Sequence, residues 1–508
     1  MKTLMSFDEL SRALGTSQQS FRRTRLFTGE GKQDPVGFAN RGFSSVSIDS
    51  RNTLPGALFV ALKGAAHDGH RFVEAAFKAG ASGAMVACSA LENPEFGLTA
   101  LAQRFNKVLI AVPDTLKGLQ NAAAAYLKQF SNLLRVGITG SSGKTTTKEI
   151  AAAIIGQEKQ VVMNKGNLNS ETGLPLSVFD VRAHHEVGIF EAGMNRRGEI
   201  AELAAVLNPC VALITNVGSA HIGILGSREA IAEEKKKIFS EFTGSNIALI
   251  PEHDDYRDFL AEGVRGKVSF YGEKSFPGFG GMRNLGLDGT EILWDGQRIR
   301  FALPGRHIMG DVSAAIAIAR EIPVSAEAIR KGLESVKPMF GRGEILRGRT
   351  TVIRDCINAN PESLAGSIEF CESLDWPGRR VYVIGEMLEL GENSRKAHER
   401  IGALLSKSKA DMVYFYGKET AISAEVFNTA VETGAVSGAE AAAVKNASRC
   451  FHTSDMEELS RSLDAYVRSG DLVLLKGSKG CALWKLSGIL TGNKADEAVS
   501  RLSYNEVS

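Results

Sequence analysis

The sequence lacks the features that mark secreted, membrane and metal-cluster proteins. It has only six cysteines, and none of them lies in a CxxC pair. Neither a zinc site nor a disulfide framework is therefore indicated, and free thiols in a reducing compartment fit the pattern best. No segment approaches about 18 uninterrupted apolar residues, and Asp8 and Glu9 come before any signal-peptide core could form. We expect a cytoplasmic protein with no integral membrane segment.

The chain also lacks an excess of either charge. With 60 basic and 58 acidic residues its net charge is +2, which gives no general field for attracting nucleic acid, so we expect no nucleic-acid partner. Hydrophobic residues at 44% and charged residues at 23% are typical of globular proteins and exclude a coiled coil or a collagen-like repeat. At 508 residues the chain exceeds one core, and about 100 to 200 residues per domain predicts three domains.

Alternating strand-like and helix-like runs predict that these domains are of the α/β class. Runs between residues 46 and 87 indicate a small N-terminal substrate domain, which we assign to residues 1–123. From residue 133 a strand, a glycine-rich turn and a helix follow one another, the order that begins a nucleotide-binding sheet. Further strands are predicted at residues 187–190 and 211–215. The central domain, residues 124–340, should therefore be a P-loop ATPase domain with a mostly parallel, doubly wound sheet.

A third domain, residues 341–508, is predicted to be Rossmann-like. Its strands alternate with helices and lie at residues 351–355, 380–384, 411–416 and 472–475. Before this domain, the glycine-rich residues 277–289 predict a loop or a β-hairpin insertion in the central domain.

The strongest motif is a phosphate loop, Gly140-Ser141-Ser142-Gly143-Lys144-Thr145-Thr146, between the first central strand and its helix. Glycines let backbone N–H groups turn toward phosphate, and the helix presents its positive end. Lys144 would reach the β- and γ-phosphates of ATP, and the Thr145 hydroxyl would hold a Mg²⁺ ion that bridges them. A usual P-loop has four residues between its glycines, but only two separate Gly140 from Gly143.

Polar residues follow two further strands of the same predicted sheet. Glu191 closes the strand at 187–190, where a second carboxylate ligand to magnesium would be needed. Asn216 and His221 follow the strand at 211–215. Open α/β sheets bind ligands at the carboxyl ends of their strands, so we expect all three residues near the phosphate loop.

The short glycine spacing resembles the Mur ligase and folylpolyglutamate synthetase superfamily, and other segments are similar to the MurF type of Mur ligase. Residues 49–51, 55–64 and 68–70 resemble the UDP-sugar-binding segment that the MurE and MurF types share. In the third domain, DCINANPES at 355–363 and GEMLELG at 385–391 are similar to MurF signatures. The resemblance extends from about residue 47 to about residue 479.

The resemblance implies an ATP-dependent ligase that joins D-alanyl-D-alanine to UDP-N-acetylmuramoyl-tripeptide through an acyl phosphate, as part of peptidoglycan synthesis. We expect a monomer. Two alternatives stay open at this point. One is another amide ligase of the superfamily, of the MurE or the folylpolyglutamate synthetase type, and the other is a nucleotide-binding protein without ligase activity. The third residue of the tripeptide is also open between diaminopimelate, lysine and ornithine.

The resemblance also implies roles for individual residues. Catalysis would use Lys144, Glu191, His221, Lys235 and Arg342. The nucleotide would contact Gly140, Ser141, Ser142, Gly143, Lys144, Thr145, Thr146, Asn216, Asp311, Arg342 and Asp355. The other substrates would contact Ser50, Arg51, Lys63, Gly64, Asp68, His70, Asn167, Asn169, Asn358, Asn360, Glu386, Glu389 and His398. Magnesium ligands would be Thr145, Glu191, His221 and Lys235, since the family's matching lysine becomes carbamylated and helps to bind a second ion. The family's matching arginine, here Arg342, swings toward the γ-phosphate.

The chain departs from the family pattern on the adenine side of the site. Ile308 and Asp311 stand where asparagines are usual, and Ile357 stands where a tyrosine is common. Elsewhere, Ser170 replaces an asparagine and Glu386 a shorter aspartate. An ionised aspartate can only accept hydrogen bonds, whereas asparagine also donates them. We therefore expect Asp311 to make discrimination among nucleotides loose.

Overall fold

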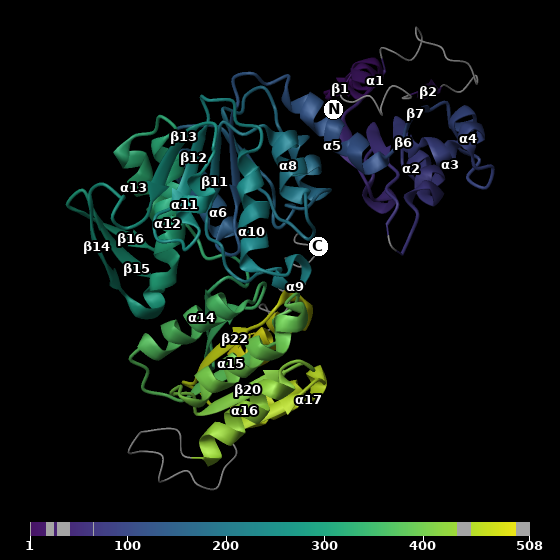
Figure 1. The fold of residues 1–508 in the computed structure, drawn as a ribbon. Helices are drawn as coiled ribbons and strands as arrows, with labels where there is room; N and C mark the ends of the chain where they lie inside the picture. The colour runs from purple at the N-terminus through teal and green to yellow at the C-terminus, as the bar shows by residue number, and fades with distance from the viewer. Residues whose placement is uncertain (1, 17–24, 28–40, 65, 434–448, 494–508) are drawn as a thin grey trace.

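The computed structural model describes residues 2–16, 25–27, 41–64, 66–433 and 449–493, which form three α/β domains (Figure 1). Figure 1 shows the central domain with the C-terminal domain below it and the N-terminal domain to one side. The link to the N-terminal domain is α5 (Thr115–Leu127), which packs against α8 (Glu199–Leu207) of the central domain.

The N-terminal domain is built on a five-stranded sheet in the order β2-β7-β6-β5-β4. The strands are β2 (Arg25–Phe27), β4 (Ser45–Ser47), β5 (Ala57–Val60), β6 (Gly83–Ala87) and β7 (Val108–Val112). Only β2 pairs antiparallel within it, and β5 and β7 are buried throughout, as parallel strands covered on both faces are. A separate pair joins β1 (Met5–Ser6) to β3 (Gly42–Phe43). The helices are α1 (Phe7–Thr16), η2 (Ser50–Asn52), η3 (Gly69–Phe72), α2 (Val73–Lys78), α3 (Cys88–Glu92), α4 (Leu98–Phe105) and α5.

The central domain has six parallel strands in the order β13-β12-β11-β8-β10-β9. They are β8 (Leu134–Thr139), β9 (Val161–Met163), β10 (Val187–Glu191), β11 (Val211–Ile214), β12 (Ile247–Pro251) and β13 (Lys267–Tyr271). Its helices are α6 (Lys144–Ile155), α7 (Gly173–Val178), α8, α9 (Ile222–Leu225), α10 (Arg228–Lys236), η4 (Lys237–Phe239), α11 (Arg257–Ala261), η6 (Arg306–Ile308), α12 (Met309–Arg320) and α13 (Ala326–Ser335). Alternate strand residues enter two cores: Val211 and Leu213 pack with α6, α12 and α13, and Ala212 and Ile214 pack with α8 and α10. The sheet is therefore covered on both faces.

The glycine-rich insertion forms a three-stranded antiparallel sheet of β14 (Phe279–Asn284), β15 (Thr290–Trp294) and β16 (Gln297–Phe301), with η5 (Gly286–Asp288) between β14 and β15. The C-terminal sheet has the order β17-β18-β22-β19-β20-β21, and only β17 is antiparallel. Its strands are β17 (Glu344–Arg347), β18 (Thr351–Asp355), β19 (Arg380–Gly385), β20 (Met412–Tyr416), β21 (Cys450–Thr453) and β22 (Leu472–Lys476). Its helices are α14 (Pro361–Ser373), η7 (Gly391–Asn393), α15 (Ser394–Ser406), α16 (Ala421–Glu432), α17 (Met456–Tyr466), η8 (Lys479–Cys481), η9 (Leu483–Leu486) and α18 (Ser487–Thr491).

The predicted fold class is confirmed: three α/β domains, with a doubly wound parallel sheet in the middle one. The exact domain limits stay predictions. The limit between residues 123 and 124 falls inside α5, and the limit between 340 and 341 falls between α13 and β17. Among the helices that the structure describes, none has the length and apolar character to span a membrane.

Candidate active site

Three neighbouring strands of the central sheet end at one edge. Strand β8 lies in the middle, paired in parallel with β10 on one side and β11 on the other. Their carboxyl ends therefore bring the phosphate loop (residues 140–146), Glu191 and Asn216 to the same edge, where open α/β sheets bind ligands. The structure thus places together the central-domain residues that the sequence pointed to.

The phosphate loop needs glycine at two positions. Gly140 (φ +154°) and Gly143 (φ +78°) have backbone angles that L side chains rarely adopt. A Cβ on Gly140 would lie 1.7 Å from Oγ1 of Thr215, and one on Gly143 would lie 2.0 Å from Oδ1 of Asp311. The ammonium of Lys144 donates to the Gly140 carbonyl at 2.8 Å. The loop curls tightly ahead of α6, the arrangement that presents backbone N–H groups to a phosphate.

Residues after β11 hold the phosphate loop in place. The N–H of Ser142 donates to Oδ1 of Asn216 at 3.1 Å, and the Thr215 hydroxyl donates to the Ser142 carbonyl at 2.6 Å. The N–H of Gly218 donates to the Ser141 hydroxyl at 2.8 Å. Asn216, which the sequence assigned to the nucleotide, therefore supports the loop that would bind it.

Glu191 is a buried carboxylate at the end of β10, only 1% exposed. Its Oε2 accepts from the Thr145 hydroxyl at 2.7 Å, and its Oε1 accepts from the amide of Asn169 at 2.6 Å. Asn167, two residues before Asn169 on the same loop, is exposed. The carboxylate thus joins the phosphate loop to the loop after β9.

Two buried residues that sequence reasoning missed fix the position of Glu191. The Asn164 side chain accepts from the Glu191 N–H at 2.9 Å and donates to the carbonyls of Glu191 at 3.1 Å and Leu168 at 2.9 Å. The ammonium of Lys148, itself fully buried, donates to the Asn164 carbonyl at 2.6 Å. Lys148 lies one turn after Lys144 on α6, and the sequence offered no sign that this side chain faces inward.

Charges from two domains surround Lys144. The pKa of Lys144 lies below its usual value, chiefly because the side chain is buried. The positive charge of Arg342 lowers this pKa further, whereas the negative charges of Glu191 and Glu389 raise it. Arg342 lies in the segment between α13 and β17, and Glu389 lies in the C-terminal domain. Two charges that the sequence assigned to this site therefore act on the phosphate-loop lysine.

Lys235 is buried in the last turn of α10 and is 1% exposed. Burial lowers its pKa well below the usual value, the Lys144 charge lowers it further, and Glu234 raises it. Its neighbour Lys236 instead donates to the Phe259 carbonyl at 2.6 Å, near the surface. Of these two adjacent lysines, Lys235 is the buried one, and both burial and the charge of Lys144 favour its neutral form.

The C-terminal domain contacts the edge of the central sheet that carries the phosphate loop, and it does so through Glu389. Nδ1 of His221 lies 2.6 Å from Oε2 of Glu389, and this contact is the largest cause of the lowered pKa of the Glu389 carboxyl. Both residues have left-handed backbone angles, φ +64° and +67°. The N–H of Gly223 donates to the Glu389 carbonyl at 3.2 Å, and Ser219 donates to Glu362 at 2.8 Å. The role of His221 as a magnesium ligand stays a prediction, since the structure pairs it with a carboxylate.

The raised pKa of Asp311 favours its neutral form over the ionised acceptor that the sequence suggested, and the expected loose discrimination among nucleotides stays a prediction. Burial raises the pKa of Asp311 from 3.8 to about 8, although a hydrogen bond from Thr147 at 3.5 Å and the charge of Arg342 lower it. At neutral pH the carboxyl therefore keeps its proton and can both donate and accept, as an asparagine does. The sequence could not reveal this, because desolvation depends on what packs around the side chain.

Several predicted residues of the C-terminal domain have side chains that serve its fold. Oδ2 of Asp355 lies 2.9 Å from the ammonium of Lys476 and accepts from the Ser367 hydroxyl at 2.6 Å. Lys476, which is 2% exposed and was given no site role from the sequence, also donates to the Asn358 carbonyl at 2.9 Å. Asn360 forms the N-terminal capping box of α14. Their roles in binding substrate or nucleotide stay predictions.

His398 supports the segment that carries Glu389. It is 1% exposed; its Nε2 accepts from the Met387 N–H at 3.2 Å, and its Nδ1 lies 2.9 Å from the Ser394 carbonyl. Glu386 accepts from the N–H of Glu419 at 2.9 Å. The buried His398 side chain thus holds the backbone near Met387 in position.

The predicted UDP-binding residues lie on two loops at the carboxyl ends of adjacent parallel strands. The loop after β4 carries Ser50 and Arg51, and the loop after β5 carries Lys63, Gly64, Asp68 and His70. His70 is 4% exposed, with Nδ1 2.6 Å from Asp68 and Nε2 accepting from the Ala87 N–H at 2.9 Å. His70 and Asp68 therefore shape the loop, whereas Arg51 and Lys63 are exposed beside it.

The residues at the phosphate loop fit a magnesium ion that the nucleotide helps to hold. The Glu191 carboxylate and the Thr145 hydroxyl supply hard oxygen atoms, the ligand type that Mg²⁺ prefers. Within the described part of the chain, no group of three or more His, Cys, Asp or Glu residues could hold a metal by itself. Phosphate oxygens and water would have to supply the remaining ligands, as is typical of phosphoryl-transfer sites.

Comparison with protein families assigns all three domains. The model described as "Mur ligase family, catalytic domain" matches residues 43–126, "Mur ligase middle domain" matches 138–319, and "Mur ligase, glutamate ligase domain" matches 341–479. Fold and site therefore define a three-domain nucleotide-dependent ligase.

Individual relatives agree with this assignment. The UDP-N-acetylmuramoyl-tripeptide--D-alanyl-D-alanine ligase of Treponema pallidum is 44% identical over 89% of this chain and 94% of its own length. The Bacillus subtilis protein of the same name is 34% identical over 86% and 91%. MurF of Thermotoga maritima, solved with ADP, has a TM-score of 0.71 at 26% identity, covering 88% of this chain and 97% of its own. The chain belongs to the Mur ligase family, and it is an ATP-binding, ATP-dependent ligase of the MurF type.

The buried asparagine behind Glu191 gives a first prediction. Asn164→Ala removes three hydrogen bonds and leaves buried backbone groups unpaired, each at a cost of about 1 to 3 kcal/mol. We expect kcat to fall at least about tenfold, equivalent to about 1.4 kcal/mol, and the Mg²⁺ concentration for half-maximal rate to rise. Asn93→Ala, on an exposed turn of the N-terminal domain, is the control. A normal Mg²⁺ dependence in Asn164→Ala would show that Glu191 needs no such support.

The protonation of Asp311 gives a second prediction. The folded protein keeps a proton that the unfolded chain releases, so stability from this group falls as the pH rises from about 4 to about 8 and is level above that. Above pH 8 the new charge would lie beside the phosphate loop and repel nucleotide. We expect the KM for ATP to rise between pH 7 and pH 9, but not in Asp311→Asn. Asp258→Asn, with its carboxyl 85% exposed, should behave as wild type. Parallel pH profiles for all three proteins would contradict the assignment.

Proposed function

We propose that the protein joins D-alanyl-D-alanine to UDP-N-acetylmuramoyl-tripeptide at the expense of ATP and so makes the pentapeptide precursor of peptidoglycan. The observation that carries the proposal is the meeting of Lys144, Glu191 and Glu389 at one edge of the central sheet. The names of the two sequence relatives support this choice of substrates. The reaction serves cell-wall biogenesis, and through it cell shape and division.

The N-terminal domain would hold the UDP end of the substrate on the loops after β4 and β5. The tripeptide would then extend along the loop of Asn167 and Asn169 toward Glu191. Contacts between domains support this path: Gln120 of α5 donates to the Glu171 carbonyl at 3.2 Å, and Lys117 pairs with Glu202 at 2.7 Å. These contacts fix the peptide-binding loop relative to the N-terminal domain.

The first chemical step brings two anions together. The terminal carboxylate of the tripeptide attacks the γ-phosphorus of ATP, and an acyl phosphate forms as ADP leaves. Lys144 and Arg342 offset the repulsion between the anions. Magnesium, held by Thr145 and Glu191 when bound, would neutralise phosphate charge and orient the transfer. Lys235, as its carbamate, would help to hold a second ion.

The second step forms the amide bond. The dipeptide amine attacks the acyl carbonyl, and phosphate leaves from a tetrahedral intermediate. Glu389, held beside His221, would attract the ammonium group of the incoming dipeptide, which must lose a proton before its nitrogen can attack. The C-terminal domain covers this edge and would exclude water, which would otherwise hydrolyse the acyl phosphate. One chain supplies all these residues, in keeping with a cytoplasmic monomer.

The proposal predicts that phosphate release depends on both acceptors. With ATP and Mg²⁺, omission of either the UDP-tripeptide or the dipeptide should reduce release to background, and Lys144→Ala should abolish it. Lys159→Ala, which alters an exposed ion pair with Glu186, should leave the rate unchanged. Vigorous ATP turnover without either acceptor would contradict the ligase and favour a nucleotide-binding protein of another kind.

The carbamate on Lys235 gives a further prediction. Only a neutral amine reacts with CO₂, and burial beside Lys144 favours that form. Lys235→Ala should lose most ligase activity and regain part of it with added acetate, which supplies an anionic oxygen ligand. Lys236→Ala should do little, since that side chain lies over the Phe259 ring. A carbamate ¹³C resonance should appear in ¹³CO₂ for wild type and be missing in Lys235→Ala. Equal damage from both substitutions would contradict the assignment.

A further inference from the structure

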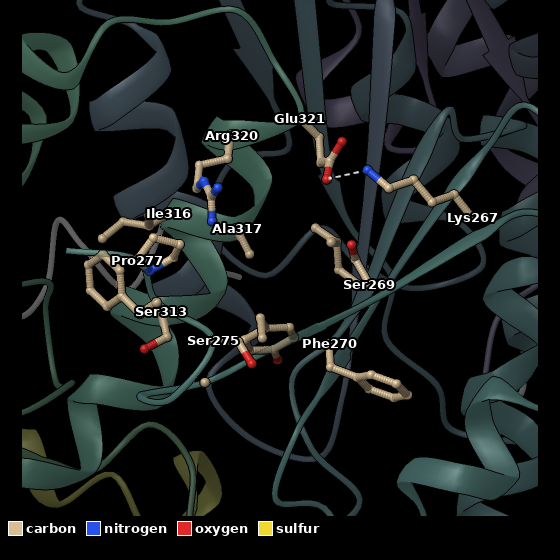
Figure 2. Close-up of a pocket in the computed structure, with 14 residues that line it drawn as sticks. Lys267, Ser269, Phe270, Ser275, Pro277, Ser313, Ile316, Ala317, Arg320 and Glu321 are labelled. Carbon is tan, nitrogen blue, oxygen red and sulfur yellow. Dashed lines mark hydrogen bonds and ion pairs between the residues drawn. The ribbon is translucent and has the colours of Figure 1, made fainter. Parts of the chain in front are cut away.

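A cavity lies away from the phosphate loop, between α12 and the edge strand β13 (Figure 2). Its volume is about 320 Å³, and the segment from Gly272 to Pro277, which leads to β14, closes one side. Ligand sites commonly have about 300 to 1,000 Å³, so the space suits a molecule about one ring in size. None of the residues assigned above to substrate, nucleotide or metal lines it.

The cavity offers one unpaired cation. Figure 2 shows the Arg320 side chain turned back along α12 toward Ala317, and within the described residues its guanidinium has no hydrogen-bond or ion-pair partner. The other cation of the wall, Lys267, already pairs with Glu321 at 3.4 Å. A single free guanidinium next to a carboxylate favours a monoanion, and its planar fork matches a carboxylate.

The rest of the lining specifies the body of the ligand. Ile316 and Phe276 are buried apolar side chains on its wall. Ser313 is 4% exposed, and its hydroxyl has no hydrogen-bond partner in the described structure. A buried hydroxyl without a partner is unfavourable, and a polar group of a ligand would relieve it. The accessible surface of the lining is mostly polar, so it suits a small carboxylate that carries a second polar group such as a hydroxyl.

Both walls of the cavity continue to the phosphate loop. The hydroxyl of Tyr271, on the β13 wall, donates to the carbonyls of Ile214 at 2.8 Å and Thr215 at 3.2 Å. Thr215 in turn donates to the Ser142 carbonyl at 2.6 Å. On the other wall, Ser313 lies on the same helix as Asp311, whose carboxyl lies against Gly143.

We propose that this cavity binds a small hydroxylated carboxylate and that its occupancy strengthens nucleotide binding. A ligand between the walls would restrict the motion of α12 and β13. The conformational-entropy cost of binding a nucleotide at the phosphate loop would then be smaller, so the nucleotide would bind more tightly. Such coupling is reciprocal: each ligand tightens the binding of the other by the same factor.

The test uses 4-hydroxybenzoate as the probe and 4-hydroxybenzamide as its neutral match, each titrated calorimetrically into the full chain. Arg320→Gln removes the cation, and Ala317→Phe fills the cavity from a half-buried position on α12. Arg300→Gln changes an exposed arginine of the nearby β16 and is the control. The Kd of ADP is then measured with and without saturating probe.

We expect the acid to bind at millimolar concentration, to fail with Arg320→Gln and with Ala317→Phe, and to bind Arg300→Gln normally. The Kd of ADP should fall about fivefold with the probe, at the low end of allosteric couplings, and should not change in Arg320→Gln. Absence of binding to wild type, equal binding of acid and amide, or equal binding to Arg320→Gln would overturn the site. An unchanged Kd of ADP at saturation would overturn the coupling.

Discussion

The buried carboxylate of Glu191 fixes how the loops at the edge of the central sheet are arranged around the phosphate loop. A carboxylate removed from water needs a donor for each oxygen, and here Thr145 and Asn169 supply them. Those donors come from the phosphate loop and from the loop after β9, so satisfying the carboxylate also fixes the two loops relative to each other. Asn164 secures the backbone of Glu191 from behind, and Lys148 secures Asn164. The proposed nucleotide and peptide sites are thereby fixed relative to each other.

The segment that carries Arg342 joins the central domain to the C-terminal domain. Gly341 (φ +64°) and Gly343 (φ +70°) flank Arg342 with turns that suit glycine. The carboxylate of Glu344 accepts from the Gly341 N–H at 3.2 Å and pairs at 2.7 Å with Arg354, which is almost fully buried. These contacts tie the segment around Arg342 to the C-terminal domain. Movement of the domain would then carry Arg342 and Glu389 together.

Features that depend on short stretches of sequence could be predicted. The phosphate loop and the insertion follow from glycine placement. Apolar runs of strand length gave β8, β10 and β11 of the central sheet and β18, β19, β20 and β22 of the C-terminal sheet, but not β9, β12, β13, β17 or β21. The burial of Lys148 and Lys476 could not be predicted, because only packing between distant segments removes a lysine from water. The raised pKa of Asp311 could not be predicted for the same reason. The hydrogen bonds of His398 and Asn360 to the domain's own backbone could not be predicted either, since a motif does not say which way a side chain points; their roles in substrate binding stay predictions.

The central claim is that a substrate carboxylate attacks ATP at the edge organised by Glu191. The most direct measurement uses UDP-N-acetylmuramoyl-tripeptide labelled with ¹⁸O in its terminal carboxylate, with D-alanyl-D-alanine, ATP and Mg²⁺. If an acyl phosphate forms, one labelled oxygen leaves with the phosphate, because the carboxylate oxygen that attacks phosphorus stays bonded to it. Mass spectrometry should then find one ¹⁸O in the released phosphate and one in the amide product. Release of unlabelled phosphate, with its new oxygen taken from water, would contradict the account.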